Sequence, residues 1–439
     1  MNKKTIASIT TPIGEGGIGV IQVSGPNSLK IVNAVFKGKK LKDLRNAESK
    51  RLYYGEIHLN GSPVDEVIVN VLRKENSFTG EDLVEVNCHG GIQAVKKTLE
   101  CIVHAGAKEV HWEELARRSL VNNKIDLIQK EALIEIPEAK TKLGVKVLLD
   151  QYNGALSSFI NKLIKKIENS DNIKNQFNYI HDKLREISET AVFGCAITLP
   201  QRLIITGKPN VGKSTLINAL LREDRSIVHI EPGTTRDAID DMISIDGIPL
   251  VIVDTAGIRK TNHKVEKLGV SESKRQLKQA DKIIIMFDNS KPLEKEDKEL
   301  TKFIMHKLEL RKRDNSHKIP VFPVINKTDL PSKLNLSTLG EKQLEPICKI
   351  SALKGDGLSI LEESLVSEFK KYTKYVPKRP TIFTKRQQEH ISKALYISKQ
   401  CVRLVREIKD TKNYSNLLND IKQNLLNCLV FSWPSPKSL

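Results

Sequence analysis

Three patterns of apolar and polar positions divide the chain into regions. Over residues 1–120, short apolar or alternating runs are interspersed with two segments of helical spacing. The runs predict strands at Thr5–Ile9, Val20–Ser24, Arg51–Leu59, Glu66–Leu72 and Leu83–Cys88. The helical spacing predicts helices at Ser28–Phe36 and Gly91–Ala105. We therefore expect residues 1–120 to form an α+β domain.

Residues 121–199 and 373–439 carry apolar residues at helical spacing instead. The predicted helical segments are Leu127–Leu149, Leu156–Ile187 and Gln387–Leu429. Because these two helical stretches are separated in the chain, the simplest topology has the segment between them inserted into one helical domain.

That inserted segment, residues 200–372, alternates strand and helix. Its predicted strands are Leu203–Thr206, Leu250–Asp254, Lys282–Asp288, Val321–Asn326 and Ile347–Ser351. Strands that alternate with helices favour a mostly parallel, doubly wound α/β sheet.

The first of these strands leads into a glycine-rich loop, Gly207–Ser214, with the sequence GKPNVGKS. The loop fits G-x-x-x-x-G-K-[ST], and helical spacing follows it. In that context, backbone N–H groups and a helix N-terminus bind phosphate oxygens. Lys213 is predicted to reach the outer phosphates and Ser214 to supply a hydroxyl to Mg²⁺. The alternative, an ordinary glycine turn before a helix, is disfavoured by the motifs downstream.

Two of those motifs would complete the phosphate end of a nucleotide site. Pro232–Asp237 (PGTTRD) is a predicted loop in which Thr235 would complete the Mg²⁺ coordination when a γ-phosphate is present. Asp254–Gly257 (DTAG) ends an apolar strand. Asp254 would hold Mg²⁺ through water, and the amide of Gly257 would contact the γ-phosphate.

Two further motifs predict a guanine-binding end. Asn326–Asp329 (NKTD) and Ser351–Leu353 (SAL) each end a predicted strand, and ligands bind at strand ends in open α/β sheets. Asp329 can accept two N–H bonds from guanine that adenine cannot supply. Lys327 can lie along the base and Asn326 can brace the loop, while a backbone amide of the SAL segment could meet the guanine O6. The sequence therefore predicts a GTPase rather than an ATPase.

The residue after the DTAG motif is Ile258, where many signalling GTPases have a glutamine that orients the attacking water. Isoleucine cannot do this, so another residue must position the water or hydrolysis is slow. Glu266 and Glu272 are acidic candidates, although the residues alone favour a solvated helix face for both. Asn210 could help to coordinate a monovalent ion.

Composition adds a possible polyanionic partner. The 439 residues include 71 Lys and Arg against 53 Asp and Glu, a formal charge of +18. Such an excess favours RNA, and a bias of composition on a solvated surface explains it equally well. The six cysteines form no CxxC pair, and no apolar run reaches transmembrane length. A cytoplasmic location is the simplest setting.

Taken together, these motifs make the chain resemble the MnmE/TrmE family of tRNA-modification GTPases. The resemblance rests on TIASITTPIGEGGIGVIQVSG, NSFTGEDLVEVNCHGG and NNKIDL in the N-terminal part. It continues through GKPNVGKS, PGTTRD, DTAG, NKTD and SAL in the order of the family. The N-terminal match separates the chain from ribosome-assembly GTPases of the same superclass.

This resemblance implies a function. Members of the family are homodimers that work with an FAD-containing partner protein, as a heterotetramer. The complex installs a (carboxymethyl)aminomethyl group on carbon 5 of the wobble uridine of certain tRNAs, using a one-carbon unit from a folate. Hydrolysis of GTP depends on Mg²⁺ and is activated by K⁺. An inserted P-loop GTPase domain, a helical domain and an α+β folate-binding N-terminal domain are the implied architecture.

The resemblance also implies roles for single residues. Lys213 and Glu266 would act in catalysis, Glu266 by orienting water. The implied Mg²⁺ ligands are Ser214 and Thr235, and the implied K⁺ ligands are Asn210, His229, Glu231 and Thr234. The implied contacts to a 5-formyltetrahydrofolate-type folate are Gln22, Glu85 and Lys124. The predicted GTP-binding residues are Asn210, Val211, Gly212, Lys213, Ser214, Thr215, His229, Ile230, Glu231, Pro232, Gly233, Thr234, Thr235, Asp254, Thr255, Ala256, Gly257, Asn326, Lys327, Thr328, Asp329, Ser351, Ala352 and Leu353.

The chain departs from the family pattern at three places. Gln22 stands where the family usually has an arginine, and Trp112–Leu115 (WEEL) replaces a Pro-Gly-Glu-Phe segment. The sequence ends in PSPKSL without the Phe-Cys-Ile-Gly-Lys ending of the family, as if truncated or frame-shifted, and Cys428 is expected to be a buried helical cysteine. An alternative function is therefore a GTP-regulated switch that binds RNA or a partner without modification activity.

Overall fold

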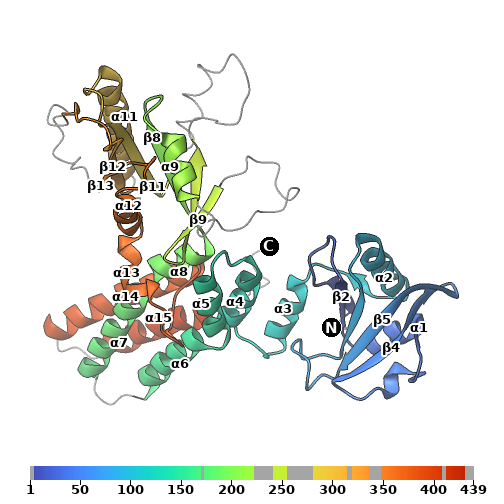
Figure 1. Ribbon diagram of the computed structural model, residues 1–439. Helices are drawn as coiled ribbons and strands as arrows, with labels where there is room; N and C mark the ends of the chain where they lie inside the picture. The colour runs from blue at the N-terminus through green and yellow to red at the C-terminus, as the bar shows by residue number, and fades with distance from the viewer. Residues whose placement is uncertain are drawn as a thin grey trace. The chain divides into compact units, whose positions relative to one another are not determined.

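The computed structural model describes residues 4–169, 173–221, 241–254, 280–313, 319–335, 348–407 and 412–430 (Figure 1). The chain forms two compact units. One contains the described residues of Met1–Pro137, Gln151–Ile164 and Gln423–Leu439, and the other those of Glu138–Asp150 and Lys165–Lys422. The four domain boundaries expected from the sequence, 1–120, 121–199, 200–372 and 373–439, stay predictions.

The N-terminal region folds as an α+β domain around a sheet, as predicted. Among the described residues the sheet has seven strands in the order β3-β4-β5-β6-β2-β1-β7, all antiparallel neighbours except β1 and β7. The strands are β1 Ile6–Ile9, β2 Ile18–Ser24, β3 Phe36–Gly38, β4 Arg51–Leu59, β5 Ser62–Leu72, β6 Leu83–His89 and β7 Lys108–Glu109. The helices are α1 Ser28–Val35, the 3₁₀ turn η1 Leu44–Asn46, α2 Ile92–His104 and α3 Glu113–Val121.

Alternation along the central strands gives this sheet two different faces. Ile21, Val23, Val84 and Val86 point to one face, where they are buried with residues of α1 and α2. Gln22 and Glu85 lie between them in sequence and therefore point to the opposite face, opposite each other in the register of β2 and β6. The opposite face is therefore polar at its centre.

The helical regions contain more and shorter helices than predicted. The helices are α4 Leu127–Glu138, α5 Lys142–Tyr152, α6 Ala155–Glu168, α7 Ile173–Ser188, α8 Ala191–Thr198, α14 Lys385–Glu407 and α15 Lys412–Leu429. The segments Leu127–Leu149 and Leu156–Ile187 are helical as predicted, and each is divided between two helices. Thr141 Oγ1 accepts a hydrogen bond from Gly144 N at 3.0 Å and starts α5 anew. Gln176 Nε2 donates to the carbonyls of Lys166 and Ile167, which close the end of α6.

The inserted region has the predicted doubly wound sheet. Its order is β13-β12-β11-β8-β10-β9, and every neighbouring pair is parallel except β9 and β10. The strands are β8 Gln201–Gly207, β9 Asp241–Ile245, β10 Ile248–Asp254, β11 Lys282–Asp288, β12 Val321–Asn326 and β13 Cys348–Lys349. The helices are α9 Lys213–Leu220, α11 Lys295–Arg313, α12 Leu358–Leu365, the 3₁₀ turn η3 Ser367–Phe369 and α13 Lys370–Thr373.

Helices cover both faces of this sheet (Figure 1). On β8, Leu203 and Ile205 pack with α9 and α12, whereas Ile204 packs with Ile304 of α11. A strand buried on both sides needs apolar residues at successive positions, which explains its continuous apolar run. The loops that follow the parallel strands consequently share one edge of the sheet.

Candidate nucleotide site

The predicted phosphate loop follows β8 at this edge. Gly207 and Gly212 have φ angles of +154° and +100°. A Cβ on Gly207 would lie 2.7 Å from the carbonyl oxygen of Met286, and one on Gly212 would collide with the side chain of Asn326. Both positions therefore need glycine for close approach as well as for backbone conformation. The loop ends at the first turn of α9, whose N-terminal N–H groups can receive an anion.

Lys213 folds back over this loop. Its Nζ donates to the carbonyl oxygens of Gly207 at 2.9 Å and Lys208 at 2.8 Å. Lys213, Ser214 and Thr215 are all half-buried on the first turn of α9. The ammonium group is thus held over the phosphate-binding loop by carbonyl oxygens, which a phosphate oxygen can replace as acceptor.

Lys208 anchors the same loop to the start of α11. Its Nζ lies 2.7 Å from Asp297 Oδ2 and 2.8 Å from Glu294 Oε2. Burial alone would lower the pKa of Lys208, but the hydrogen bonds to the two carboxylates outweigh it and raise the pKa. The Lys208 carbonyl that accepts from Lys213 therefore belongs to a residue whose side chain is held by two ion pairs.

Asn326 connects three of the predicted motifs. Its Nδ2 donates to the carbonyl oxygen of Val211 at 2.9 Å, and its Oδ1 accepts from the amide of Ala352 at 2.9 Å. The side chain is 2% exposed. The phosphate loop, the NKTD segment and the SAL segment therefore meet at one buried amide.

Asp329 lies beside the SAL segment. Its Oδ1 accepts a hydrogen bond from Ser351 Oγ at 2.7 Å, and the amide of Thr328 donates to the Ile350 carbonyl at 3.1 Å. The bond from Ser351 holds the pKa of Asp329 below its ordinary value. Asp329 Oδ2 has no hydrogen-bond partner in the described parts of the chain. Leu353, in contrast to Ser351 and Ala352, is 78% exposed.

Lys327 reveals a site residue that the sequence reasoning missed. Its Nζ lies 2.6 Å from Asp288 Oδ2 and donates to the carbonyl of Asn210 at 2.8 Å. Asp288 is buried at the end of β11, and its Oδ1 accepts from the amide and hydroxyl of Ser290. The pKa of Asp288 is lowered because the bonds from Lys327 and Ser290 outweigh the opposing effect of burial. An acidic residue at the end of a parallel strand was the available signal.

Part of the predicted site lies outside the described residues. This applies to His229, Ile230, Glu231, Pro232, Gly233, Thr234, Thr235, Thr255, Ala256, Gly257, Ile258, Glu266 and Glu272. Asp254 ends β10, and its backbone pairs with Ile205 of β8. Asn210 is exposed with a φ of +62°.

The predicted folate contacts occupy the polar face of the N-terminal sheet. Gln22 Nε2 donates to Glu85 Oε1 at 2.8 Å, and Asn70 Nδ2 donates to Glu85 Oε2 at 2.9 Å. Asn70 Oδ1 is buried and accepts no hydrogen bond within the described structure. Lys124 is not joined to this row, because its Nζ donates to the Glu75 carbonyl at 3.4 Å.

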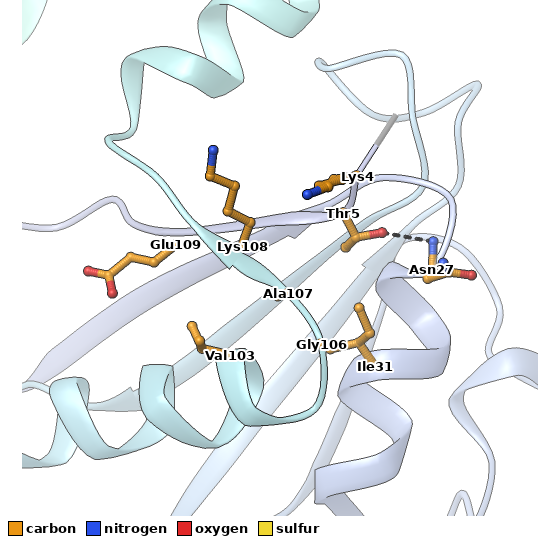
Figure 2. Close-up of a pocket in the computed structure, with 9 residues that line it drawn as sticks. All are labelled: Lys4, Thr5, Asn27, Ile31, Val103, Gly106, Ala107, Lys108 and Glu109. Carbon is orange, nitrogen blue, oxygen red and sulfur yellow. Dashed lines mark hydrogen bonds between the residues drawn. The ribbon is translucent and has the colours of Figure 1, made fainter. Parts of the chain in front are cut away.

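A separate pocket of about 550 Å³ opens beside β1 and β7. Figure 2 shows Lys4, Thr5 and Asn27 near its rim, with the backbone N–H of Asn27 donating to Thr5 Oγ1 at 3.0 Å. None of Gln22, Glu85 and Lys124 lines it. The predicted folate contacts and this pocket are consequently different places on the domain.

Two remaining expectations concern single features. Cys428 is buried in α15, as predicted for a helical cysteine. Within the described ranges, no helix has both the length and the apolar character needed to cross a membrane.

Comparison with known proteins decides which family this arrangement represents. A family described as "GTP-binding protein TrmE N-terminus" matches residues 5–124, and one described as "50S ribosome-binding GTPase" matches residues 202–327. The tRNA modification GTPase MnmE of Alkaliphilus metalliredigens is 39% identical over 388 residues, covering 82% of this chain and 81% of that protein. The chain belongs to the MnmE family of tRNA modification GTPases.

Further relatives agree with this membership. The MnmE protein of Carboxydothermus hydrogenoformans is 40% identical over 390 residues, covering 83% of this chain and 82% of that protein. A crystal structure of Aquifex aeolicus Era bound to GDP and AlF4⁻ is 30% identical and covers 45% of this chain and 66% of that chain, with a TM-score of 0.29. Membership of the MnmE family rests on the sequence matches alone.

Proposed function

We propose that this chain hydrolyses GTP to GDP and phosphate as the GTPase subunit of a tRNA-modifying complex. The observation that carries the proposal is the buried side chain of Asn326, which joins the phosphate loop to the base-recognition segments within a member of the MnmE family. The complex adds a (carboxymethyl)aminomethyl group to carbon 5 of the wobble uridine of certain tRNAs. The alternative function, a switch without modification activity, is not better supported than the GTPase subunit.

The phosphates bind to the loop amides and the N-terminus of α9. Lys213 then exchanges the carbonyls of Gly207 and Lys208 for phosphate oxygens, where its charge offsets the charge that develops during hydrolysis. The donor set fits Mg²⁺, which prefers oxygen ligands, because Ser214 offers a hydroxyl on the same turn. Thr235 would be its second protein ligand, and Asp254 would hold it through water. When bound, Mg²⁺ neutralises phosphate charge.

Guanine binds between the NKTD and SAL segments. Asp329, kept ionised by Ser351, accepts the two N–H bonds of the base. A backbone amide of the SAL segment that is not already bonded to Asn326 donates to its O6. Lys327, held by Asp288, lies along the ring. Adenine has an acceptor and a C–H in place of those two N–H groups, so this arrangement rejects ATP by leaving the carboxylate unpaired.

When bound, K⁺ would supply positive charge that activates hydrolysis. Asn210, His229, Glu231 and Thr234 would hold this ion, and Glu266 would orient the attacking water, which Ile258 cannot do. The support for these roles is the match of residue types to the family. The chain acts as a homodimer in the cytoplasm with an FAD-dependent partner protein and tRNA.

The N-terminal domain would bind a 5-formyltetrahydrofolate-type folate through Gln22, Glu85 and Lys124. The polar row of Gln22, Glu85 and Asn70 supports this proposal, because a pterin ring offers N–H donors that a carboxylate can accept. Folate supplies the one-carbon unit of the modification.

The function is tested by nucleoside mass spectrometry. A strain whose only copy of the gene encodes this chain should contain the modified wobble uridine, and a strain with no copy should lack it. Absence of the nucleoside in both strains, together with normal GTP hydrolysis by the purified chain, would favour the switch. The same purified chain should hydrolyse GTP faster in KCl than in NaCl.

A further inference from the structure

Helix α14 has two opposite faces. Its buried face consists of Gln387, Ile391, Ala394, Ser398 and Cys401, each 0% exposed. At about 100° per residue, these positions cluster on the side opposite Tyr396. Figure 1 shows that α14 lies along α7, and Ser398 Oγ is 3.0 Å from Nδ1 of His181 on that helix. Tyr396 therefore points away from the helical packing.

The outward face is basic around one exposed aromatic ring. We call it the α14 stripe, and its members are Lys393, Tyr396, Lys399, Gln400 and Arg403. All are exposed, and all lie within about 60° of Tyr396 around the helix axis. Tyr396 is 64% exposed. Tyr396 therefore offers an uncovered ring beside two exposed lysines.

The lysines of the stripe are not neutralised by nearby acids. Lys393 and Lys399 take part in no ion pair within the described ranges. On the facing helix α7, Asp182 Oδ1 is 3.5 Å from Arg185 and so has a cation of its own. Glu389 is the acidic residue on the same face, one turn before Lys393. The stripe beyond that residue carries positive charge alone.

Helix α11 shows what a solvated basic helix looks like in the same chain. Its exposed residues Lys295, Glu296, Glu299 and Lys302 mix both signs, and Lys295 lies 3.7 Å from Glu299 one turn later. Within the described residues Lys393 and Lys399 take part in no such pair, and the exposed ring of Tyr396 lies between them. This difference between the α14 stripe and α11 indicates that the stripe binds an anionic partner with planar groups that can stack on Tyr396.

We propose that the α14 stripe binds an unpaired loop of the tRNA substrate. Lys393 and Lys399 contact phosphates, and Tyr396 stacks on an unstacked base, which is the way proteins recognise single-stranded RNA. Gln400 hydrogen-bonds the same nucleotide. This proposal rests on the proposed function, which supplies tRNA as the partner.

The test measures binding of a fluorescent, unmodified tRNA transcript to the full-length chain as a function of KCl concentration. K393A/K399A should weaken binding at least about tenfold at low salt and reduce the slope of log Kd against log salt by about 1.4 to 1.8, the counterions of two phosphates. Y396A should weaken binding at least about fivefold with an unchanged slope, and Y396F should restore it, because phenylalanine still stacks.

Matched controls separate the possible failures. K295A/K302A removes two exposed lysines from α11 and should leave the affinity for tRNA unchanged, and all variants should hydrolyse GTP at the normal rate. If the wild-type chain binds no tRNA, the proposed function fails. If it binds and the stripe variants bind equally well, the stripe proposal alone fails. If the stripe variants still bind tRNA normally but no longer bind the FAD-containing partner, the stripe proposal is overturned and the stripe is a protein-binding surface.

Discussion

The nucleotide edge of the inserted sheet and the polar face of the N-terminal sheet were both predicted as binding sites, and they are organised differently. At the nucleotide edge, Asn326 fixes three segments. Asp329 is anchored through one oxygen, while no described residue bonds the other. On the N-terminal face, Glu85 is bonded through both oxygens, to Gln22 and Asn70. The nucleotide site therefore has a carboxylate oxygen of Asp329 available to a ligand. On the N-terminal face, both oxygens of Glu85 already accept hydrogen bonds from neighbouring side-chain amides.

The difference shows that the hydrogen bonds around a carboxylate decide how easily a ligand can bind to it. A ligand pays little reorganisation cost at a carboxylate that is held through one oxygen and open at the other. At Glu85 a ligand must displace an amide first. We therefore expect substitutions at the nucleotide edge to have larger effects than those on the N-terminal face.

The largest effect is expected for Asp329→Asn. Losing a charged acceptor of two hydrogen bonds should reduce the affinity for GTP on the order of 10³-fold, at about 1.5–3 kcal/mol for each bond to a charged group. The asparagine can donate to the 2-oxo group of xanthine, so binding of XTP should increase. Fluorescent-nucleotide competition measures both. Asp356→Asn, at an exposed acid of the same loop, is the control and should change neither.

Glu266→Ala should reduce kcat on the order of 10²-fold with little change in GTP affinity, because orienting water acts in the transition state alone. Glu272→Ala is the matched control. Single-turnover hydrolysis in KCl measures the rates. Equal rates for the two variants would remove the role proposed for Glu266.

Asp288→Asn should weaken GTP and GDP about tenfold each, because Lys327 loses its ion pair beside the phosphate loop, while kcat at saturation is kept. Ser290→Ala keeps that ion pair and should bind normally. Since the folded pKa of Asp288 is lowered, its stabilising contribution is full above its ordinary value of 3.8 and is lost as the pH falls through the folded pKa. The stabilities of Asp288→Asn and wild type should therefore converge only in acid, which denaturation series would reveal.

The smallest effect is expected on the N-terminal face. Gln22→Arg restores the residue usual in the family and should strengthen binding of 5-formyltetrahydrofolate several-fold, because a guanidinium adds a charged donor. Gln93→Arg adds the same charge at an exposed position of α2 and should have no effect. Tighter binding in both variants would mean that net charge alone matters, and calorimetry distinguishes these results.

The bounds of strands were predicted correctly where both faces of the strand are buried. The strands Lys282–Asp288 and Val321–Asn326 have the predicted bounds, because continuous apolar runs flanked by polar residues leave one interpretation. The break before α5 was missed because the apolar period continues across Thr141 while a side-chain cap restarts the helix. β13 ends at Lys349, before the predicted end at Ser351, which pairs with Asp356 instead. Ile347 lies outside the described residues. The strand β9 was missed as a short segment after a predicted loop.

In the site, motif residues could be predicted and their supporting contacts could not. Asp288 meets Lys327 across 39 positions of sequence, and no local pattern reports that pairing. The exposure of Tyr396 also depends on which face of α14 packs, and the packing partner α7 lies far away in the chain. Tertiary contacts of this kind have no periodicity in the sequence.

Calorimetric titration of the purified chain with nucleotides tests the central claim, that guanine is held by Asp329 beside the phosphate loop. The account predicts saturable heat with GTP and GDP and none with ATP at the same concentrations. Equal heats with ATP and GTP, or no heat with GDP, would contradict it.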